Sequence, residues 1–212
     1  MFAHAMGIVV AAIVVVALVA LLRLPRIKGW FGERAVSHLG LRRLDRDCYT
    51  VIDDLILPRS DGRGTTQVDH VVVARTGIFV IETKDYSGRI YGRAADRRWT
   101  QVIGGKKHAF QNPLHQNNLH VKAIAKLLEV PSSVCRPVVF FIGSATFRPP
   151  VPAGVLQRGL LPWIHSHLEI VLSPEQVARA TAVLRQAKAT TDGREARVNH
   201  IAATRARTGR RA

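Results

Sequence analysis

The sequence predicts an α/β protein with a mixed central sheet flanked by helices, preceded by one transmembrane helix. The fold class follows from the order of local patterns along the chain. A helix, three strands, a second helix, a further strand and a last helix succeed one another, which is typical of α/β domains. The transmembrane helix follows from residues 5–22, which carry no charged or strongly polar side chain. As a helix this run rises about 27 Å, close to the thickness of the hydrocarbon core of a bilayer.

The flanks of this run indicate a retained anchor. A cleaved signal peptide would need a basic start and a small-residue cleavage site, whereas only His4 precedes the run and LLRLPR follows it. A buried core helix is disfavoured because no face is polar. Arg23, Arg26 and Lys28 follow the run and no Lys or Arg precedes it. By the positive-inside rule we expect a single-pass protein of the cell membrane with its carboxyl-terminal domain in the cytoplasm.

The first half of the remaining chain predicts one helix and three strands. Apolar residues recur at helical spacing over 30–44, and strands are predicted over 49–57, 66–74 and 78–84. Arg75-Thr76-Gly77 is the turn signal between the last two strands. These strands are therefore expected to run as a meander.

The second half predicts a hairpin, two helices and further strands. Asn112 and Pro113 are typical of a helix start, as are Ser173, Pro174 and Glu175. The expected elements are a hairpin of 88–91 with 99–103, a helix over 113–129, a central strand over 134–142, an irregular segment over 147–162, a short strand over 168–172 and a helix over 173–188.

Composition narrows the function classes. The chain has 31 basic and 15 acidic residues, a net charge of +16, and 47% hydrophobic residues. That apolar content argues against a disordered polymer, and a single long apolar run argues against a polytopic membrane protein. The charge predicts attraction to a polyanion, either nucleic acid or an anionic membrane face, without choosing between them. Cys48 and Cys135 are too few for a disulfide framework or a cysteine-rich metal site.

Three charged residues stand in or at the end of apolar strands. Asp69 lies in one strand, and Glu82 and Lys84 end the next. An isolated E-x-K at a strand end is usually a simple ion pair in water. If Thr76-Gly77 is a two-residue turn, Asp69 faces Lys84 and all three side chains share one face of the sheet. With a three-residue turn the register slips by one, so that His70 opposes Glu82 and Asp69 points away.

The arrangement in which all three side chains share one face suits the hydrolysis of a phosphate ester. Carboxylate oxygens bind Mg²⁺ or Mn²⁺, and such a metal lowers the pKa of a bound water. A lysine beside them can orient that water and stabilise developing negative charge. Asp69, Glu82 and Lys84 are therefore candidate catalytic residues.

Five spaced motifs resemble the NERD (nuclease-related) domain family. They are GERAV at 32–36, QVDHVVV at 67–73, GIFVIETKDYSGRIYG at 77–92, Trp99, and NPLHQNNLHVKAI at 112–124. The resemblance covers roughly residues 31–142 and implies a metal-dependent nuclease core of the PD-(D/E)XK restriction-endonuclease-like superfold. We accordingly expect an anchor with its basic flank over 1–28, a NERD domain over 29–190 and a basic, flexible tail over 191–212.

The resemblance implies roles for individual residues. Glu33 matches the acid of the first helix, Asp69 the acid of the second core strand, and Glu82 with Lys84 the E-x-K pair. Gln116 resembles a glutamine that supports the site from the following helix in related nucleases. Glu33, Asp69 and Glu82 are the implied ligands of Mg²⁺ or Mn²⁺.

Several neighbouring residues are given other roles. In related nucleases a tyrosine often follows that glutamine by four residues, where this chain has His120. His70 is expected to pack on the opposite strand face, whereas Gln67 shares a face with Asp69 and is a candidate contact to the site or a phosphate. Trp99 is expected in the core.

The remaining polar residues divide into two groups. The histidines His108, His115 and His120 are expected at polar helix or loop positions, because no compact zinc pattern with cysteine is present. The candidate nucleic-acid contacts, besides Gln67, are Arg97, Arg98, Lys106 and Lys107.

Three functions compete on this evidence. The first is a membrane-anchored, metal-dependent nuclease that cuts DNA rather than RNA. The second is a catalytically quiet nucleic-acid-binding module at the membrane, and the third is a membrane-surface protein that holds anionic lipid. The converging carboxylates favour the nuclease, because lipid binding has no need of them.

Overall fold

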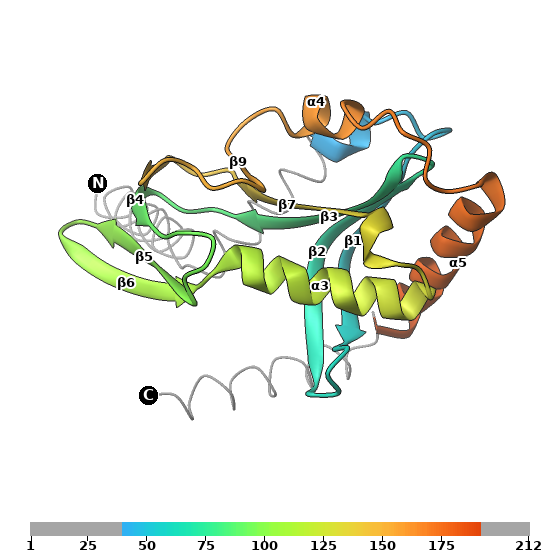
Figure 1. Ribbon diagram of the computed structural model, residues 1–212, viewed down its shortest axis with the longest axis horizontal. Helices are drawn as coiled ribbons and strands as arrows, with labels where there is room; N and C mark the ends of the chain where they lie inside the picture. The colour runs from blue at the N-terminus through green and yellow to red at the C-terminus, as the bar shows by residue number, and fades with distance from the viewer. Residues whose placement is uncertain (1–39, 192–212) are drawn as a thin grey trace, which may run out of the picture.

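The computed structural model describes residues 40–191 (Figure 1). The predicted anchor over 5–22, the predicted ligand Glu33 and residues 192–212 lie outside the described residues. Within residues 40–191, no helix is both long and apolar enough to span a bilayer.

Two mixed sheets form the scaffold. A five-stranded sheet has the order β1-β2-β3-β7-β9, and a four-stranded sheet has the order β6-β5-β4-β8. The first comprises β1 (Thr50–Pro58), β2 (Thr65–Ala74), β3 (Gly77–Lys84), β7 (Cys135–Phe141) and β9 (Val155–Leu156). The second comprises β4 (Gly88–Tyr91), β5 (Arg98–Ile103), β6 (Lys106–Gln111) and β8 (Ala145–Arg148). Antiparallel pairing joins β1, β2 and β3, and parallel pairing joins β3, β7 and β9, so the predicted mixed α/β class is confirmed.

Helices cover both faces of the five-stranded sheet (Figure 1). On one face, α3 (Pro113–Leu128) and α5 (Pro174–Thr191) pack over β1, β2 and β3. On the other, the short helix α4 (Leu160–His165) and the 3-10 turn η2 (Leu41–Arg43) cover β2, β3 and β7. A second 3-10 turn, η3 (Ser132–Val134), leads into β7.

The starts of both long helices are those that the sequence predicts. The Asn112 side chain accepts a hydrogen bond from the Leu114 backbone N–H at 2.9 Å, and Pro113 opens α3. At α5, the Ser173 N–H donates to Gln176 Oε1 at 2.7 Å, and the Gln176 N–H donates to Ser173 Oγ at 3.3 Å. This reciprocal pair is a capping box, which satisfies donors that a helix start leaves free.

The two sheets meet around an aromatic cluster. Trp99 of β5 is fully buried and packs near Phe110, Phe141 and Phe147, with ring centroids 6.1 to 6.4 Å apart. Its indole N–H donates to the Arg93 carbonyl at 2.9 Å. The prediction that Trp99 belongs to the core is therefore confirmed.

The described chain has a second sheet besides the predicted central one, and several segments differ from expectation. Strand β6 escaped prediction because its sequence, KKHAFQ, is almost wholly exposed and lacks an apolar alternation. The segment over 147–162, expected to be irregular, holds the end of β8, all of β9 and the start of α4.

The expected strand over 168–172 is also absent from the described chain. Leu168 and Ile170 are exposed there. The backbone N–H groups of Val171 and Leu172 both donate to the Arg75 carbonyl at 3.0 Å, so this segment lies against the β2–β3 turn instead of extending a sheet. Of the helix expected over 30–44, the described part holds only the turn η2.

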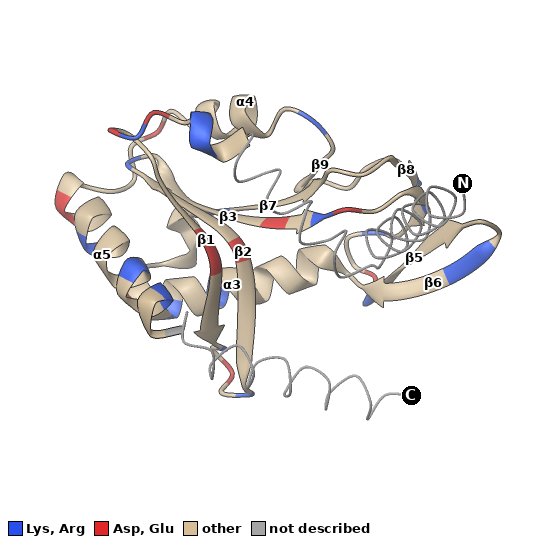
Figure 2. Ribbon diagram, turned by 180° about the vertical axis from the view of Figure 1, so that it is seen from behind, with Lys and Arg blue, Asp and Glu red and all other residues tan. Residues whose placement is uncertain are grey.

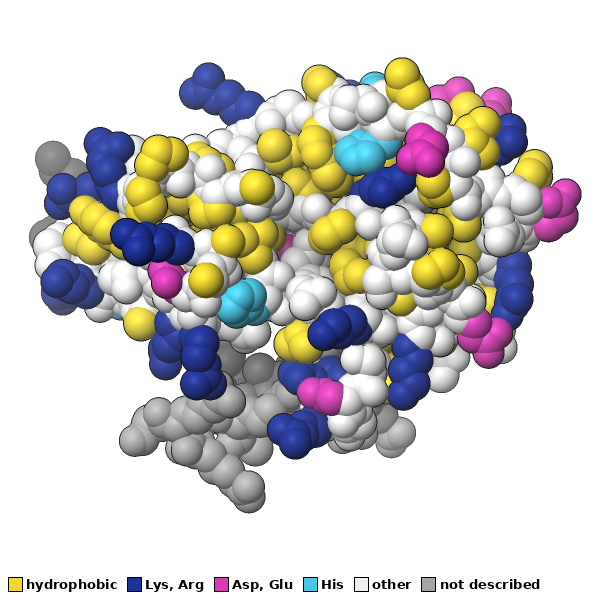
Figure 3. Space-filling view, in the orientation of Figure 1, with side chains coloured by type: hydrophobic (Ala, Val, Ile, Leu, Met, Phe, Trp, Pro, Cys, Tyr) yellow, Lys and Arg dark blue, Asp and Glu magenta, His cyan; other side chains and the backbone are white. Residues whose placement is uncertain are grey.

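Two groups of charged residues matter for the site. Acidic positions on β1, β2 and β3 lie side by side in the five-stranded sheet (Figure 2). Lys and Arg side chains are prominent over the end of the molecule formed by β4, β5 and β6 (Figure 3). Acidic residues of three neighbouring strands thus lie within one sheet, and exposed cations are prominent at the end formed by the second sheet.

Candidate active site

The β2–β3 turn decides whether Asp69 can meet Glu82. The turn consists of Arg75-Thr76 alone, and Ala74 pairs with Gly77. Continuing this register along the strands places Asp69 opposite Glu82. Opposed residues of antiparallel strands point to the same side, so the arrangement that favours a site is the one formed. The register differs by two residues from the predicted pairing of Asp69 with Lys84, which leaves Asp69, Glu82 and Lys84 on the shared face that was predicted.

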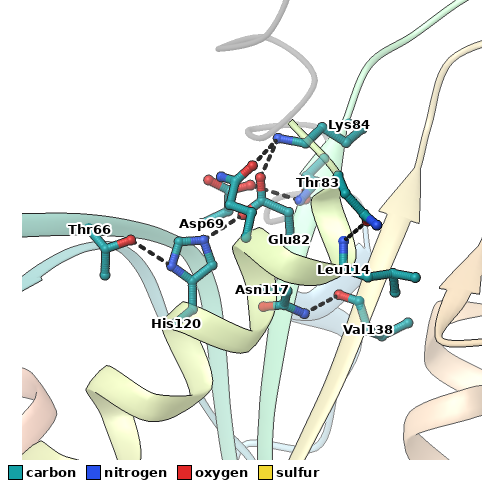
Figure 4. Close-up of polar contacts among 11 residues, drawn as sticks. Thr66, Asp69, Glu82, Thr83, Lys84, Leu114, Asn117, His120 and Val138 are labelled. Atoms are coloured by element: carbon teal, nitrogen blue, oxygen red, sulfur yellow. Dashed lines mark hydrogen bonds and ion pairs between the residues drawn. The ribbon is translucent and has the colours of Figure 1, made fainter. Parts of the chain in front are cut away.

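The ladder between β2 and β3 ends where the acids begin. Its last backbone pair is His70 with Ile81. Beyond it, the Thr83 backbone N–H donates to Asp69 Oδ2 at 2.7 Å, so a side chain takes the place of a strand carbonyl. The half-buried carboxylate of Asp69 is thereby fixed beside Glu82 (Figure 4).

The alternation of side chains along β2 is broken, and Gln67 therefore does not share the face of Asp69. Val68 and Val71 would face opposite sides in a regular strand, yet both pack in the core under α3 and α5. On the adjacent strand, Asp54 has a positive φ of 56°, an uncommon backbone for this residue within a strand. The Gln67 side chain donates to Asp54 Oδ1 at 2.9 Å. Gln67, predicted to share the face of Asp69, thus lies against β1.

Glu82, Lys84 and Gln116 form a connected group. The Lys84 ammonium donates to Glu82 Oε1 and, at 3.1 Å, to Gln116 Oε1 of α3 (Figure 4). Glu82 is only 1% exposed and Lys84 is 17% exposed, so the ion pair is largely withdrawn from water. The structure therefore brings together four of the five predicted catalytic residues.

His120 is the residue that sequence reasoning missed. It was expected at a polar helix or loop position, but its side chain is 1% exposed. Its Nε2 lies 3.0 Å from Glu82 Oε2, and its Nδ1 lies 3.0 Å from Thr66 Oγ1. The available signal was its spacing, because a residue four positions after Gln116 shares that face of the helix.

Opposing effects set the charge states of the ion pair. Burial alone raises the pKa of the Glu82 carboxyl, but Lys84 and His120 outweigh it and bring that pKa below its ordinary value. Burial alone lowers the pKa of Lys84, but the carboxylates of Glu82 and Asp69 raise it well above its ordinary value. Each group therefore holds the other in its charged form.

A buried amide anchors α3 beside these groups. The Asn117 side chain donates to the carbonyls of Val80 and Val138, both at 3.0 Å, and so ties the helix to β3 and β7. Gln116 precedes this anchor, and His120 follows it by less than one helical turn. The anchor thus sets the position of both side chains relative to β3.

Comparison with known proteins identifies the family. A model of the nuclease-related domain, NERD, matches residues 28–142. This chain belongs to the NERD family. The matched range of the NERD domain contains all five predicted catalytic residues and also His120.

One relative extends the comparison. An uncharacterized protein of Bacillus anthracis is 49% identical over 105 residues, which are 50% of this chain and 49% of that protein. This chain therefore spans about half the length of that relative. No solved structure matches this NERD protein.

The metal-binding capacity of this NERD domain rests on oxygen donors. Asp69 and Glu82 supply carboxylates, and the third implied ligand, Glu33, lies outside the described residues. Among residues 40–191, no three side chains of His, Cys, Asp or Glu are grouped to hold a metal ion. The two carboxylates are hard oxygen donors of the kind that Mg²⁺ and Mn²⁺ prefer, so their chemistry fits either ion. Residues 40–191 supply only two of the three implied ligands.

The remaining candidates lie away from this group. His70 is buried, and its Nδ1 lies 2.8 Å from Asp53 Oδ1, which confirms that it packs instead of facing Glu82. The predicted nucleic-acid contacts at the β5–β6 hairpin are all exposed: Arg97, Arg98, Lys106 and Lys107. Lys106 and Lys107 begin the edge strand β6 at the turn of the hairpin, whereas Arg98 lies at the opposite end of the hairpin, paired with Gln111; basic positions on β6 can be seen in Figure 2.

Proposed function

We propose that this NERD protein is a membrane-anchored nuclease that hydrolyses phosphodiester bonds in DNA with Mg²⁺ or Mn²⁺. The observation that carries the proposal is the convergence of Asp69, Glu82 and Lys84 beside Gln116. A solvated salt bridge would not need a buried glutamate, a second carboxylate and a helix-borne amide around one lysine. Membership of a nuclease-related family supports the same reaction class.

Each residue of the site has its own role in the proposed hydrolysis. Asp69 and Glu82 would hold the metal, together with Glu33, and the bound ion would supply an acidified water and charge neutralisation. Lys84 stays protonated between its carboxylate neighbours, so its ammonium can stabilise negative charge on the phosphate. Gln116 Oε1 accepts a hydrogen bond from the Lys84 ammonium and so limits the directions in which that ammonium can point.

Substrate and membrane are contacted by other segments in this proposal. The exposed cations of the β5–β6 hairpin are suited to a phosphate backbone, which binds by charge without regard to sequence. The uncharged run over 5–22 would anchor the chain in the cell membrane, with the NERD domain in the cytoplasm. DNA at the membrane is then the expected substrate.

The full-length chain, purified in mild detergent, tests the nuclease. We expect it to cut plasmid and linear DNA with Mg²⁺ or Mn²⁺ and to stop with EDTA. Lys84→Ala should abolish cutting and retain DNA binding, whereas Lys122→Ala, an exposed lysine of α3, should cut normally. Undiminished cutting by Lys84→Ala would overturn the assignment of the site, and an inactive wild type with both metals would overturn the nuclease.

One observation favours a second candidate, a quiet DNA-binding module. Both oxygens of Glu82 already have partners, Lys84 and His120, so a metal must compete for Oε1. If Lys84 keeps that oxygen, the domain binds DNA without cutting it. This candidate predicts salt-sensitive binding with no metal-stimulated cleavage in the same assay.

A further inference from the structure

The two oxygens of the Glu82 carboxylate have different partners. Oε1 faces the Lys84 ammonium, which is 17% exposed and therefore still reaches solvent. Oε2 faces His120 Nε2 at 3.0 Å, and both of these side chains are 1% exposed. Oε1 therefore lies toward the partly exposed ammonium, whereas Oε2 is enclosed with His120, so a cation that joins or displaces Lys84 would meet Oε1.

The proton on His120 can be assigned from its neighbours. A neutral imidazole has one N–H donor and one acceptor nitrogen. The Thr66 hydroxyl, 3.0 Å from Nδ1, can donate, whereas the Glu82 carboxylate can only accept. For a neutral ring, the pattern that satisfies every group has Thr66 donating to Nδ1 and the Nε2–H donating to Oε2.

We propose that His120, held by Thr66, is a positioning residue that makes Glu82 a one-oxygen ligand and thereby favours Mg²⁺ over Ca²⁺. This proposal rests on the metal site of the proposed function. Mg²⁺ is small and is bound through few carboxylate oxygens while it keeps several waters, whereas Ca²⁺ often takes both oxygens of one carboxylate. A carboxylate whose Oε2 is occupied by a buried N–H suits the first ion better than the second.

A purely structural role for His120 predicts something different. Asn117 already ties α3 to β3 and β7, so the helix has an anchor independent of His120. If His120 only fastened the helix, its loss would lower thermal stability and leave the ratio of Mg²⁺ to Ca²⁺ affinity unchanged. The affinity ratio therefore separates the two roles.

The decisive measurement is calorimetric titration of Mg²⁺ and Ca²⁺ into the full-length chain in detergent. His120→Leu should weaken Mg²⁺ binding about 10–100-fold, as is usual when a group that orients a ligand is lost, and should reduce the preference over Ca²⁺. His120→Gln should recover part of both, because its amide N–H can still donate to Oε2. His115→Leu, an exposed histidine of the same helix, should match the wild type.

The possible outcomes test the positioning role of His120 separately from the proposed nuclease activity. A wild type that prefers Mg²⁺ but never cuts DNA overturns the nuclease and supports the positioning role if His120→Leu removes the preference. An unchanged affinity ratio in His120→Leu, or in Thr66→Val should the leucine variant not fold, overturns the positioning role. Nitrogen-15 spectra of the metal-free protein give an independent check. A proton on Nδ1 of His120, instead of Nε2, would also overturn it.

Discussion

The carboxylate of Asp69 accepts a hydrogen bond from the backbone N–H of Thr83, with Oδ2 2.7 Å from the nitrogen. This bond continues the β2–β3 pairing one step past its last backbone pair. The same side chain is a proposed metal ligand and raises the pKa of Lys84. Asp69 therefore combines a structural and a chemical role, and substitutions can separate them.

Asp69→Asn should fold normally and fail to cut DNA. The asparagine carbonyl can still accept from the Thr83 N–H, but the negative charge that a metal requires is gone. Asp69→Ala should in addition lose about 1–3 kcal/mol of unfolding free energy, because the Thr83 N–H loses its acceptor. Urea denaturation and a Mg²⁺-dependent cleavage assay measure the two effects. Normal cutting by Asp69→Asn would exclude Asp69 as a ligand.

The sequence predicted the elements around the site better than their exact register. Glu82 and Lys84 share a strand face by alternation alone, and that part needed no structure. The relation of Asp69 to them depended on the length of the β2–β3 turn, which Arg75-Thr76-Gly77 leaves open between two and three residues. Whether the turn has an even or an odd number of residues decides on which face of the sheet Asp69 lies. The periodicity of the sequence cannot specify that number, because backbone pairing across the strands sets it.

Other differences between the predicted and the observed site arose where the local sequence pattern gives no signal. The break in alternation between Val68 and Val71 coincides with the positive φ of Asp54 on the adjacent strand, a distortion with no signature in the sequence. The burial of His120 depends on how closely α3 packs on β3, which its helical spacing suggests but does not determine. Tertiary contacts therefore decide the details of the site that local propensity does not.

Asn117→Leu should destabilise the protein by about 1–3 kcal/mol, because the anchor to Val80 and Val138 is lost within a buried region. It should also weaken cleavage, since Gln116 and His120 depend on the seating of α3. Asn118→Leu replaces the exposed neighbour and should leave both properties near wild type. Denaturant unfolding and initial cleavage rates provide the comparison. Equal stability of the two variants would show that the amide is not an anchor.

Gly143→Ala should disturb the segment that follows Lys84. An added Cβ at Gly143 would lie 2.0 Å from the Tyr86 backbone oxygen, a contact that only backbone movement can relieve. The preceding N–H, of Ile142, donates to the Lys84 carbonyl at 3.0 Å, so the movement should reach the site. We expect lower thermal stability and reduced cleavage. Gly40→Ala is the control, because its added Cβ meets no atom within 4 Å.

The two cysteines should differ in reactivity. Burial raises the pKa of the Cys135 thiol to about 11; the negative charge of Asp45 also raises the pKa of Cys48, but that thiol is exposed. The thiolate is the reactive form, so iodoacetamide at pH 8 should label Cys48 and spare Cys135 until the protein unfolds. Mass spectrometry of native and urea-treated samples measures this difference. Rapid labelling of Cys135 in the native state would contradict its burial.

The same pKa shift makes a prediction about stability in alkali. The folded Cys135 thiol keeps its proton until about pH 11, whereas an unperturbed thiol loses it near 9.0. Between these values the unfolded state binds fewer protons, so the unfolding free energy falls as pH rises. Cys135→Ala should show a shallower decline than wild type over this window in urea titrations. Parallel declines would exclude a contribution from this thiol.

Replacing Lys106 and Lys107 of the β5–β6 hairpin by alanine should weaken DNA binding equally for all sequences. Each lost phosphate contact lowers the slope of log affinity against log salt by about 1. The double variant should therefore show a slope shallower by about 2 if both lysines touch phosphate. The matched control is Lys122→Ala with Lys126→Ala, two exposed lysines on α3. Fluorescence anisotropy at several salt concentrations measures both slopes. An equal loss in the control would mean that the net charge attracts DNA diffusely and that the hairpin is no dedicated contact. A loss confined to the hairpin pair would place the DNA backbone along the second sheet.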